Sequence, residues 1–252
     1  MEKNHNHKAT NPVPGCVFCD AESRIPDTLA YAPGLDESQT VYAFGRWFFV
    51  TIDKHIVTSA PTPYFLIVPY DHYTSYAQLS GDDKGAELEK LIAFTHFVVL
   101  NDRSTAPFAL NRVIFEHGQM RQGNKVKSVY HAHLHVLYGQ FAAEFLMASV
   151  LHEMEALEIP FFLVDHHRNY LETLQTNVPA GVDYLYFQVN DTCVVAIDEG
   201  NERIYSQFFR QILAKSSGDA FINWKTATED EHQIFCERLY QSLPLNPLSF
   251  LH

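Results

Sequence analysis

The sequence predicts an α+β protein in which helices pack on a β-sheet, and two patterns lead to this fold class. Short segments rich in Val, Ile, Phe and Tyr, bounded by Gly, Pro or Thr, are typical of strands. These expected strands span residues 40–52, 63–70, 112–118 and 128–139. Longer segments with apolar residues at helical spacing are typical of amphipathic helices. These expected helices span residues 80–100 and 142–157.

The helix expected over residues 80–100 opens with a serine and two acidic residues, which favour a helix N-terminus. Its inward face is expected to be formed by Leu88, Leu91, Ile92 and Thr95. Side chains three and four positions apart lie on the same side of a helix. We therefore expect this face to pack against the sheet.

The C-terminal part of the chain repeats the same kinds of element. Residues 183–189 and 192–198 are expected to form a hairpin across the Asn-Asp pair between them. Residues 206–215 are expected to form a helix. No repeat with a fixed period is visible. The shared order of strands and helix nevertheless leaves room for a diverged duplication.

Composition limits the class of function. With 252 residues, 46% of them hydrophobic, the chain can fill the core of one large or two small domains. A formal net charge of −12 repels polyanions, so we expect no nucleic-acid partner and no membrane partner. No apolar run reaches the roughly 18 to 20 residues that span a bilayer, and the N-terminus lacks the hydrophobic centre of a secretion signal. We expect a cytoplasmic protein.

Three histidines occupy alternate positions in residues 128–139, which read SVYHAHLHVLYG. Because side chains alternate along a strand, His131, His133 and His135 are expected on one face, opposite an apolar face. Alternate residues lie about 6.6 Å apart, so the outer two histidines would be about 13 Å apart and could not easily share one metal ion. The three imidazoles are therefore expected to have different roles, as metal ligands or as a nucleophile and its supports.

The HAHLHVL segment resembles the His-x-His-x-His-x-x motif of the histidine-triad (HIT) superfamily of nucleotide hydrolases and transferases, in which x is hydrophobic. CVFC near the N-terminus, FLIVPYDH in the first half and Ser128-Val129 before the first histidine support this resemblance. Together these motifs cover about residues 16–140. The resemblance implies a HIT-like antiparallel sheet with helices packed on it.

The polar composition of the N-terminus, the pattern of elements and this resemblance together predict three regions. Residues 1–15 would be a disordered tail, and residues 16–158 a HIT-like catalytic domain. Residues 159–252 would form a C-terminal α+β extension packed on that domain.

The resemblance implies a role for each histidine. His133, the middle one, would attack the α-phosphorus of a nucleotide and form a nucleotidyl-histidine that water then breaks. An imidazole suits this role because it is neutral near pH 7 and has one lone-pair nitrogen. His135 and Ser128 would stabilise the phosphate as charge develops. Members with histidine at the third position resemble hydrolases, and those with glutamine resemble transferases.

Cys16 and Cys19 form a Cys-x-x-Cys pair, which supplies two of the four ligands of a tetrahedral zinc site. The resemblance implies that His72 and His131 complete it, because some bacterial members of the superfamily use the corresponding histidines. Such a closed site would be structural. Two reduced free thiols in a turn are the alternative.

The substrate-binding residues are implied by weaker similarity. His117 takes the position of an asparagine in many members, and Lys127 lies in a basic loop that suits a polyphosphate. Asp53 would hold the ribose, and Gln207 or Arg210 would reach the site from the last helix. A solvated hairpin and an ordinary exposed helix face remain alternatives for these segments.

The leading hypothesis is a hydrolase that cleaves a nucleoside phosphoanhydride or phosphoramidate, such as a dinucleoside polyphosphate, through His133. A nucleotidyltransferase or phosphorylase of the same superfamily and a noncatalytic nucleotide-binding protein are the alternatives. A metalloenzyme that uses His131 and His133 as ligands is a further one. We expect a nucleotide or dinucleoside polyphosphate as partner, and a homodimer stays open.

Overall fold

The computed structural model describes residues 11–16, 18–19, 41–52, 63–101, 111–119, 130–164, 169–198, 203–205, 207–218 and 228. In this part of the chain one sheet has the strand order β1-β2-β3-β5-β4-β7-β8-β6, and every neighbouring pair is antiparallel. The strands are β1 (Val41–Phe44), β2 (Phe48–Ile52), β3 (Tyr64–Pro69), β4 (Asn111–Gly118), β5 (Leu134–Gly139), β6 (Phe161–Val164), β7 (Asp183–Val189) and β8 (Thr192–Asp198).

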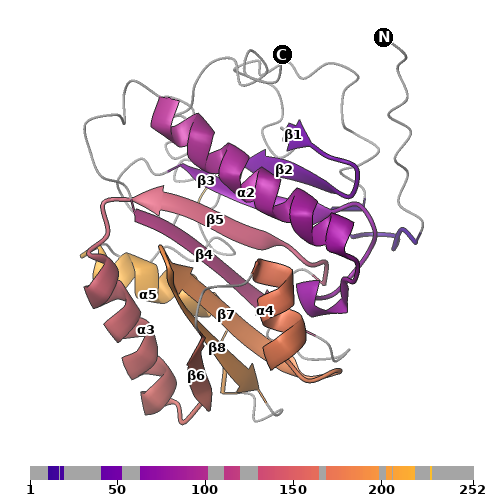
Figure 1. Cartoon of the computed structure of the whole chain (residues 1–252). Coiled ribbons are helices and arrows are strands. Elements are labelled where there is room, and N and C mark those ends of the chain that lie inside the picture. The colour runs from indigo at the N-terminus through magenta and orange to yellow at the C-terminus, as the bar shows by residue number, and fades with distance from the viewer. Residues whose placement is uncertain are drawn as a thin grey trace, which may run out of the picture.

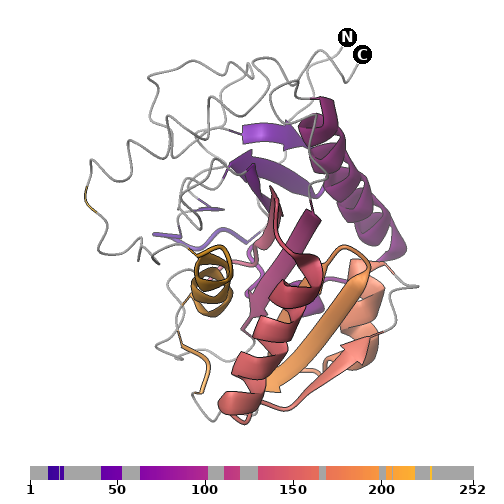
Figure 2. The same ribbon diagram turned by 90° about the vertical axis from the view of Figure 1, so that its left-hand side faces the viewer.

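Helices cover both faces of this sheet (Figure 1, Figure 2). The described helices are α2 (Asp82–Asn101), α3 (Ala143–Ala156), α4 (Tyr170–Asn177), α5 (Phe208–Ser216) and the short 3-10 helix η2 (Tyr76–Gln78). Apolar residues of α2 and α4 share one buried cluster with one face of the sheet, and those of α3 and α5 share a second cluster with the other. The expected α+β class, with an antiparallel sheet between packed helices, is confirmed.

The alternating pattern of the sequence explains this layering. Leu134 and Val136 of β5 point to the α2 face, whereas Leu137 points to the α3 and α5 face. In α2 the expected inward residues are all buried: Leu88, Leu91, Ile92 and Thr95. The hairpin expected across Asn190 and Asp191 is confirmed, with β7 and β8 on either side.

Two expectations about the elements were wrong, and a third difference concerns elements that were not expected. Residues 40–52 form two strands, because Glu87 of α2 accepts hydrogen bonds from the backbone amides of Trp47 and Phe48 and so holds a turn there. The strand expected over 128–139 begins only at Leu134, because the amide of Ala132 donates to Tyr73 outside the sheet ladder.

The third difference is that β6 and α4 were not expected. Strand β6 has only four residues and α4 only eight, which is too short for a clear periodic signal. Asn169 starts α4 as its N-cap, since its side chain accepts a hydrogen bond from the amide of Glu172 at 2.9 Å.

The element order supports the notion of two similar halves. Apart from the short η2, the series β3-α2-β4-β5-α3 is followed by β6-α4-β7-β8-α5. The sheet order β3-β5-β4 is mirrored by β7-β8-β6, so the two halves meet where β4 pairs with β7. Helices α2 and α4 lie on one face, and α3 and α5 on the other. The chain is therefore arranged about an approximate two-fold axis between β4 and β7.

A buried carboxylate reinforces that junction. Glu116 of β4 is 1% exposed, and its side chain accepts hydrogen bonds from the amide of Tyr76 at 2.9 Å and from the hydroxyl of Tyr170 at 2.5 Å. The hydroxyl of Tyr184 in β7 also donates to the Glu116 carboxylate. The oxygen of this Tyr184 hydroxyl accepts a hydrogen bond from the Ser75 hydroxyl at 3.0 Å. The carboxylate thus connects β4 with η2, α4 and β7.

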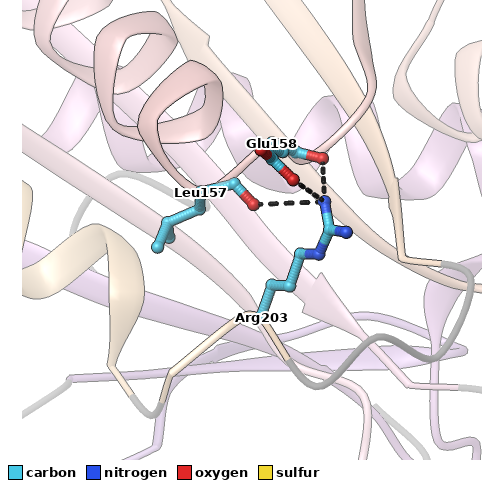
Figure 3. Close-up of polar contacts among 3 residues, drawn as sticks. All are labelled: Leu157, Glu158 and Arg203. Carbon is cyan, nitrogen blue, oxygen red and sulfur yellow. Dashed lines mark hydrogen bonds and ion pairs between the residues drawn. The ribbon is translucent and has the colours of Figure 1, made fainter.

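Arg203 connects the segment before α5 to the end of α3 (Figure 3). Its Nη1 donates to the carbonyl of Glu158 at 2.5 Å and lies 3.4 Å from both the carbonyl of Leu157 and the carboxylate of Glu158. The last carbonyls of a helix lack partners within the helix, and a cation satisfies them. This contact helps to set the direction in which the chain approaches α5.

We predict that Glu116→Ala lowers the free energy of unfolding by about 3 kcal/mol or more, because it leaves three buried donors without their acceptor. Glu116→Gln should cost less, since the amide oxygen can still accept. Urea denaturation would measure both. The exposed Glu155→Ala on α3, which lies on the opposite face of the sheet, is the control and should stay within about 0.5 kcal/mol of the unmodified protein. Equal stability of Glu116→Ala and the control would contradict the role given to Glu116.

The buried tyrosines predict a loss of stability at alkaline pH. Burial, and then the charge of Glu116, raise the pKa values of Tyr76, Tyr170 and Tyr184 well above the usual value, and burial raises the pKa of Tyr138 to about 12. Unfolded phenols ionise near about pH 10. The contribution of these tyrosines to stability should therefore be fully present below about pH 10 and be lost as the pH rises towards the folded pKa values, by roughly 1.4 kcal/mol per tyrosine and pH unit. Urea denaturation across this range, with phenolate absorbance, would test it. A stability independent of pH there would be the contrary result.

Candidate metal centre and histidine site

Two cysteines and two histidines from three separate segments meet at one point. Their ligand atoms all lie within 4.8 Å of one another, and the residues are Cys16, Cys19, His72 and His131. Nδ1 of His131 lies 3.4 Å from Sγ of Cys16 and 3.5 Å from Sγ of Cys19. Nδ1 of His72 lies 3.3 Å from Sγ of Cys19.

These distances fit a tetrahedral metal centre. Zinc bonds of about 2.3 Å to sulfur and about 2.0–2.1 Å to nitrogen place the two ligand atoms roughly 3.6 Å apart at a tetrahedral angle. The three sulfur–nitrogen distances are 3.3 to 3.5 Å. Both cysteines are free thiols that are not joined by a disulfide. The cluster could therefore hold a metal ion such as zinc, with all four positions filled by protein.

Local hydrogen bonds bring the ligands together. Gly15, at φ +77°, allows the turn that precedes the cysteines, in which the amide of Cys16 donates to the carbonyl of Val13 at 3.1 Å. The side chain of Asn11 accepts from the amide of His72 at 2.9 Å and donates to its carbonyl at 3.2 Å. These contacts dock the N-terminal segment on the loop that follows β3.

His131 is oriented by its second ring nitrogen. Nε2 lies 2.8 Å from the carbonyl of Pro69, which can only accept a hydrogen bond. The proton therefore lies on Nε2, and Nδ1 presents its lone pair to the cysteines. Metal-binding histidines commonly have such a carbonyl partner, which fixes the tautomer and the ring plane.

His133 has the opposite arrangement. Its Nδ1 lies 2.7 Å from the carbonyl of His131, so Nδ1 carries the proton and Nε2 the lone pair. The side chain is half-buried, and the ring of Phe18 lies 5.4 Å from it between centroids. The backbone of the metal-cluster histidine thus directs the neighbouring imidazole.

His135 is 7% exposed, more enclosed than His133, and lies under α5. Its Nδ1 is 2.7 Å from the hydroxyl of Tyr64 in β3. Phe115 of β4 stacks on its ring, with centroids 4.3 Å apart and planes 12° from parallel. The rings of His133 and His135 are 4.8 Å apart between centroids, so the two imidazoles share one site.

Helix α5 brings a cation to this site from the second half of the chain. The guanidinium carbon of Arg210 lies 5.2 Å from the centroid of the Tyr64 ring, and the side chain is only 7% exposed. Phe209 lies 5.3 Å from Phe115 between ring centroids. A positive charge and an aromatic wall therefore cover the face that carries His135.

The other predicted site residues lie as follows. His117 is half-buried on β4, two positions after Phe115 and so on the same face of the sheet. Gln207 is the half-buried N-cap of α5, in the left-handed conformation at φ +62°. Three further predicted residues lie outside the described part of the chain: Asp53, Lys127 and Ser128.

Sequence reasoning missed Tyr64 and Phe115 as members of the site. Both occur in strands where aromatic residues are common, so nothing local distinguished them. The pairing of Phe115 with His135 across β4 and β5 would have identified Phe115 as a site residue. That pairing depends on the register of β4 against β5, which the sequence does not give. Tyr64 reaches His135 diagonally, because its own cross-strand partner is Leu137.

In the described residues no helix is both long and apolar enough to cross a membrane. No known family profile matches the chain, and no curated protein matches it at a significant level.

Distant similarity to solved structures was found. A yeast Ap4A phosphorylase, Apa2, in complex with AMP gives a TM-score of 0.37 at 12% identity, over 80% of this chain and 76% of that chain. The same enzyme in complex with Ap4A gives 0.38 at 10%, over 79% and 71%. A DUF4931 family protein from Bacillus cereus gives 0.36 at 14%, over 79% and 98%. Similarities of this strength identify no function, which must be argued from the site itself.

Proposed function

We propose that this protein is a histidine-triad nucleotide hydrolase, which cleaves a nucleoside phosphoanhydride or phosphoramidate at the α-phosphate through a nucleotidyl-histidine. The observation that supports this most is the hydrogen bond from Nδ1 of His133 to the carbonyl of His131, at 2.7 Å. It leaves the lone pair on Nε2 of a half-buried imidazole, as a nucleophile requires.

In the first step Nε2 of His133 attacks the α-phosphorus. A nitrogen–phosphorus bond forms, and the bond from phosphorus to the leaving group breaks. The electron pair of the broken bond goes to the leaving atom, which departs as a phosphate oxyanion when the substrate is a phosphoanhydride. His135, on the same face, donates a hydrogen bond to the charge that develops.

In the second step water attacks the same phosphorus. The nucleotide takes the hydroxyl of water, and the electron pair of the nitrogen–phosphorus bond returns to His133. When the leaving group has departed as an oxyanion, the remaining proton of water passes to solvent. Enzyme and imidazole are restored, and a nucleoside monophosphate is released.

Five other residues are proposed to bind the substrate or its charge. Ser128 would support the phosphate, and Lys127 a polyphosphate tail. Asp53 would hold the ribose, while His117 and Gln207 approach from β4 and α5. The last two proposals are supported by His117 lying on the same face as Phe115 and by Gln207 lying at the start of the helix that covers this face.

The metal is proposed to be structural zinc, held by Cys16, Cys19, His72 and His131. With four protein ligands, it would have no open position for substrate. Its contribution would be to fix the N-terminal segment and the backbone of His131.

We predict that His133→Ala abolishes turnover of a dinucleoside polyphosphate, with a loss of about 10³-fold or more. In the unmodified protein, rapid quenching in denaturant at alkaline pH, which preserves a nitrogen–phosphorus bond, followed by mass spectrometry should detect a nucleotide attached to His133. The exposed His152→Ala on α3 is the matched control and should retain both activity and labelling. Full activity in His133→Ala would exclude the proposed mechanism.

The products of the same assay separate the alternative functions. A nucleoside monophosphate without an acceptor indicates hydrolysis. A nucleotide transferred to phosphate or another acceptor indicates a phosphorylase or transferase. Binding of the nucleotide with no product indicates a noncatalytic protein.

For the metal, we predict about one zinc ion per chain by elemental analysis of the purified protein. Cys16→Ser should lower this ratio and the thermal stability, because one ligand is lost. Cys193→Ala, which removes the buried cysteine of β8, should leave the zinc ratio unchanged. The same zinc content in both variants would argue against the site.

A further inference from the structure

We propose that Tyr64 is a positioning residue that sets the tautomer of His135 and completes a proton relay to the leaving group. The inference rests on the proposed function, since it concerns the same reaction at the same site. Its starting point is the 2.7 Å contact between the hydroxyl of Tyr64 and Nδ1 of His135. His135 is 7% exposed and Tyr64 is 3% exposed, so the contact is shielded from water.

Two neighbouring histidines have different partners at the same ring atom. Nδ1 of His133 faces the carbonyl of His131, which only accepts, so the proton of His133 lies on Nδ1. Nδ1 of His135 faces a phenol, which can donate. When the phenol donates, the proton of His135 lies on Nε2. The adjacent rings, 4.8 Å apart between centroids, then present a lone pair and an N–H group.

Arg210 favours donation by the phenol. Its guanidinium carbon lies 5.2 Å from the centroid of the Tyr64 ring. Because Arg210 is buried, water screens the interaction between its charge and the phenol only weakly. A cation there stabilises the negative charge that develops on the phenol oxygen as its proton moves towards His135. Stacking of Phe115 on His135 holds the imidazole plane during this transfer.

The relay supplies the proton that the leaving nitrogen needs when a phosphorus–nitrogen bond is cleaved. As Nε2 of His133 bonds to phosphorus, the electron pair of the broken bond goes to the leaving nitrogen, which takes the Nε2 proton of His135. The phenol proton of Tyr64 moves to Nδ1 of His135, and the phenolate faces Arg210. In the second step water gives a proton to Nε2 of His135, and the Nδ1 proton returns to Tyr64.

The relay matters most where the leaving atom cannot depart without a proton. An amine leaving from a phosphoramidate needs one, whereas p-nitrophenolate leaves as a stable anion. Loss of Tyr64's hydroxyl should therefore slow the first kind of substrate far more than the second. A residue with only a structural role would slow both equally.

The test compares Tyr64→Phe with the unmodified protein on a nucleoside phosphoramidate and on the p-nitrophenyl ester of the same nucleoside monophosphate. Tyr64→Phe keeps the ring beneath Arg210 but removes the hydroxyl. We expect kcat on the phosphoramidate to fall about 100-fold, against about threefold or less on the ester. Tyr205→Phe is the control, because that tyrosine bonds Glu153 of α3 and lies outside the site.

A second measurement reads the tautomer without any turnover. Nitrogen NMR of histidine-labelled protein should find the proton of His135 on Nε2 in the unmodified protein, and on both nitrogens in exchange in Tyr64→Phe. A proton fixed on Nδ1 of His135 in the unmodified protein would overturn the proposal.

The kinetic outcomes separate this proposal from the one on which it rests. If the unmodified protein is labelled at His133 but Tyr64→Phe slows both substrates equally, the positioning role is wrong and the hydrolase proposal stands. If the unmodified protein neither forms the labelled histidine nor releases product from either substrate, the proposed function itself is wrong.

Discussion

The antiparallel pairing of β4 with β7 is the contact on which the rest of the molecule depends. It joins the two halves of the chain into one sheet, and so determines which side chains of the second half reach the histidines of the first. Glu116 reinforces the pairing from the α2 side, because the hydroxyls of Tyr170 and Tyr184 both donate to it. A buried carboxylate is stable there only while these donors remain in place. The pairing thereby also fixes the position of α5.

His131 links the cysteine and histidine cluster to His133, the proposed nucleophile. Its Nδ1 faces Cys16 and Cys19, its Nε2 is held by Pro69, and its carbonyl accepts from His133. With both ring nitrogens occupied, the residue has little freedom to rotate. The position of the carbonyl that accepts from His133 is therefore set by groups on two other segments of the chain. This explains why a cluster with no open position for substrate lies directly beside the proposed reaction centre.

Local patterns were sufficient to predict the α2 face and the pairing of Cys16 with Cys19, because spacing carries that information. The family resemblance, and not the local pattern, implied that His72 and His131 join the two cysteines. The contact between Tyr64 and His135 was beyond such reasoning, since it joins residues 71 positions apart through the register of β3 against β5. Arg210 illustrates a different limit. The sequence left open whether this residue reaches the site or lies on an exposed helix face, and its burial over the Tyr64 ring is fixed only once the sheet has been assembled.

The two halves share an order of elements but not a chemistry. The β5 face that carries His135 corresponds in the second half to the β8 face of Val194 and Ala196, which are fully buried apolar residues. The first half therefore carries imidazoles on this face of β5, whereas the second half carries buried apolar side chains on the corresponding face of β8. Helix α5 crosses the junction, however, and puts Arg210 over Tyr64. The second half is thus better understood as covering the proposed site of the first half and adding a positive charge to it than as forming a second site of its own.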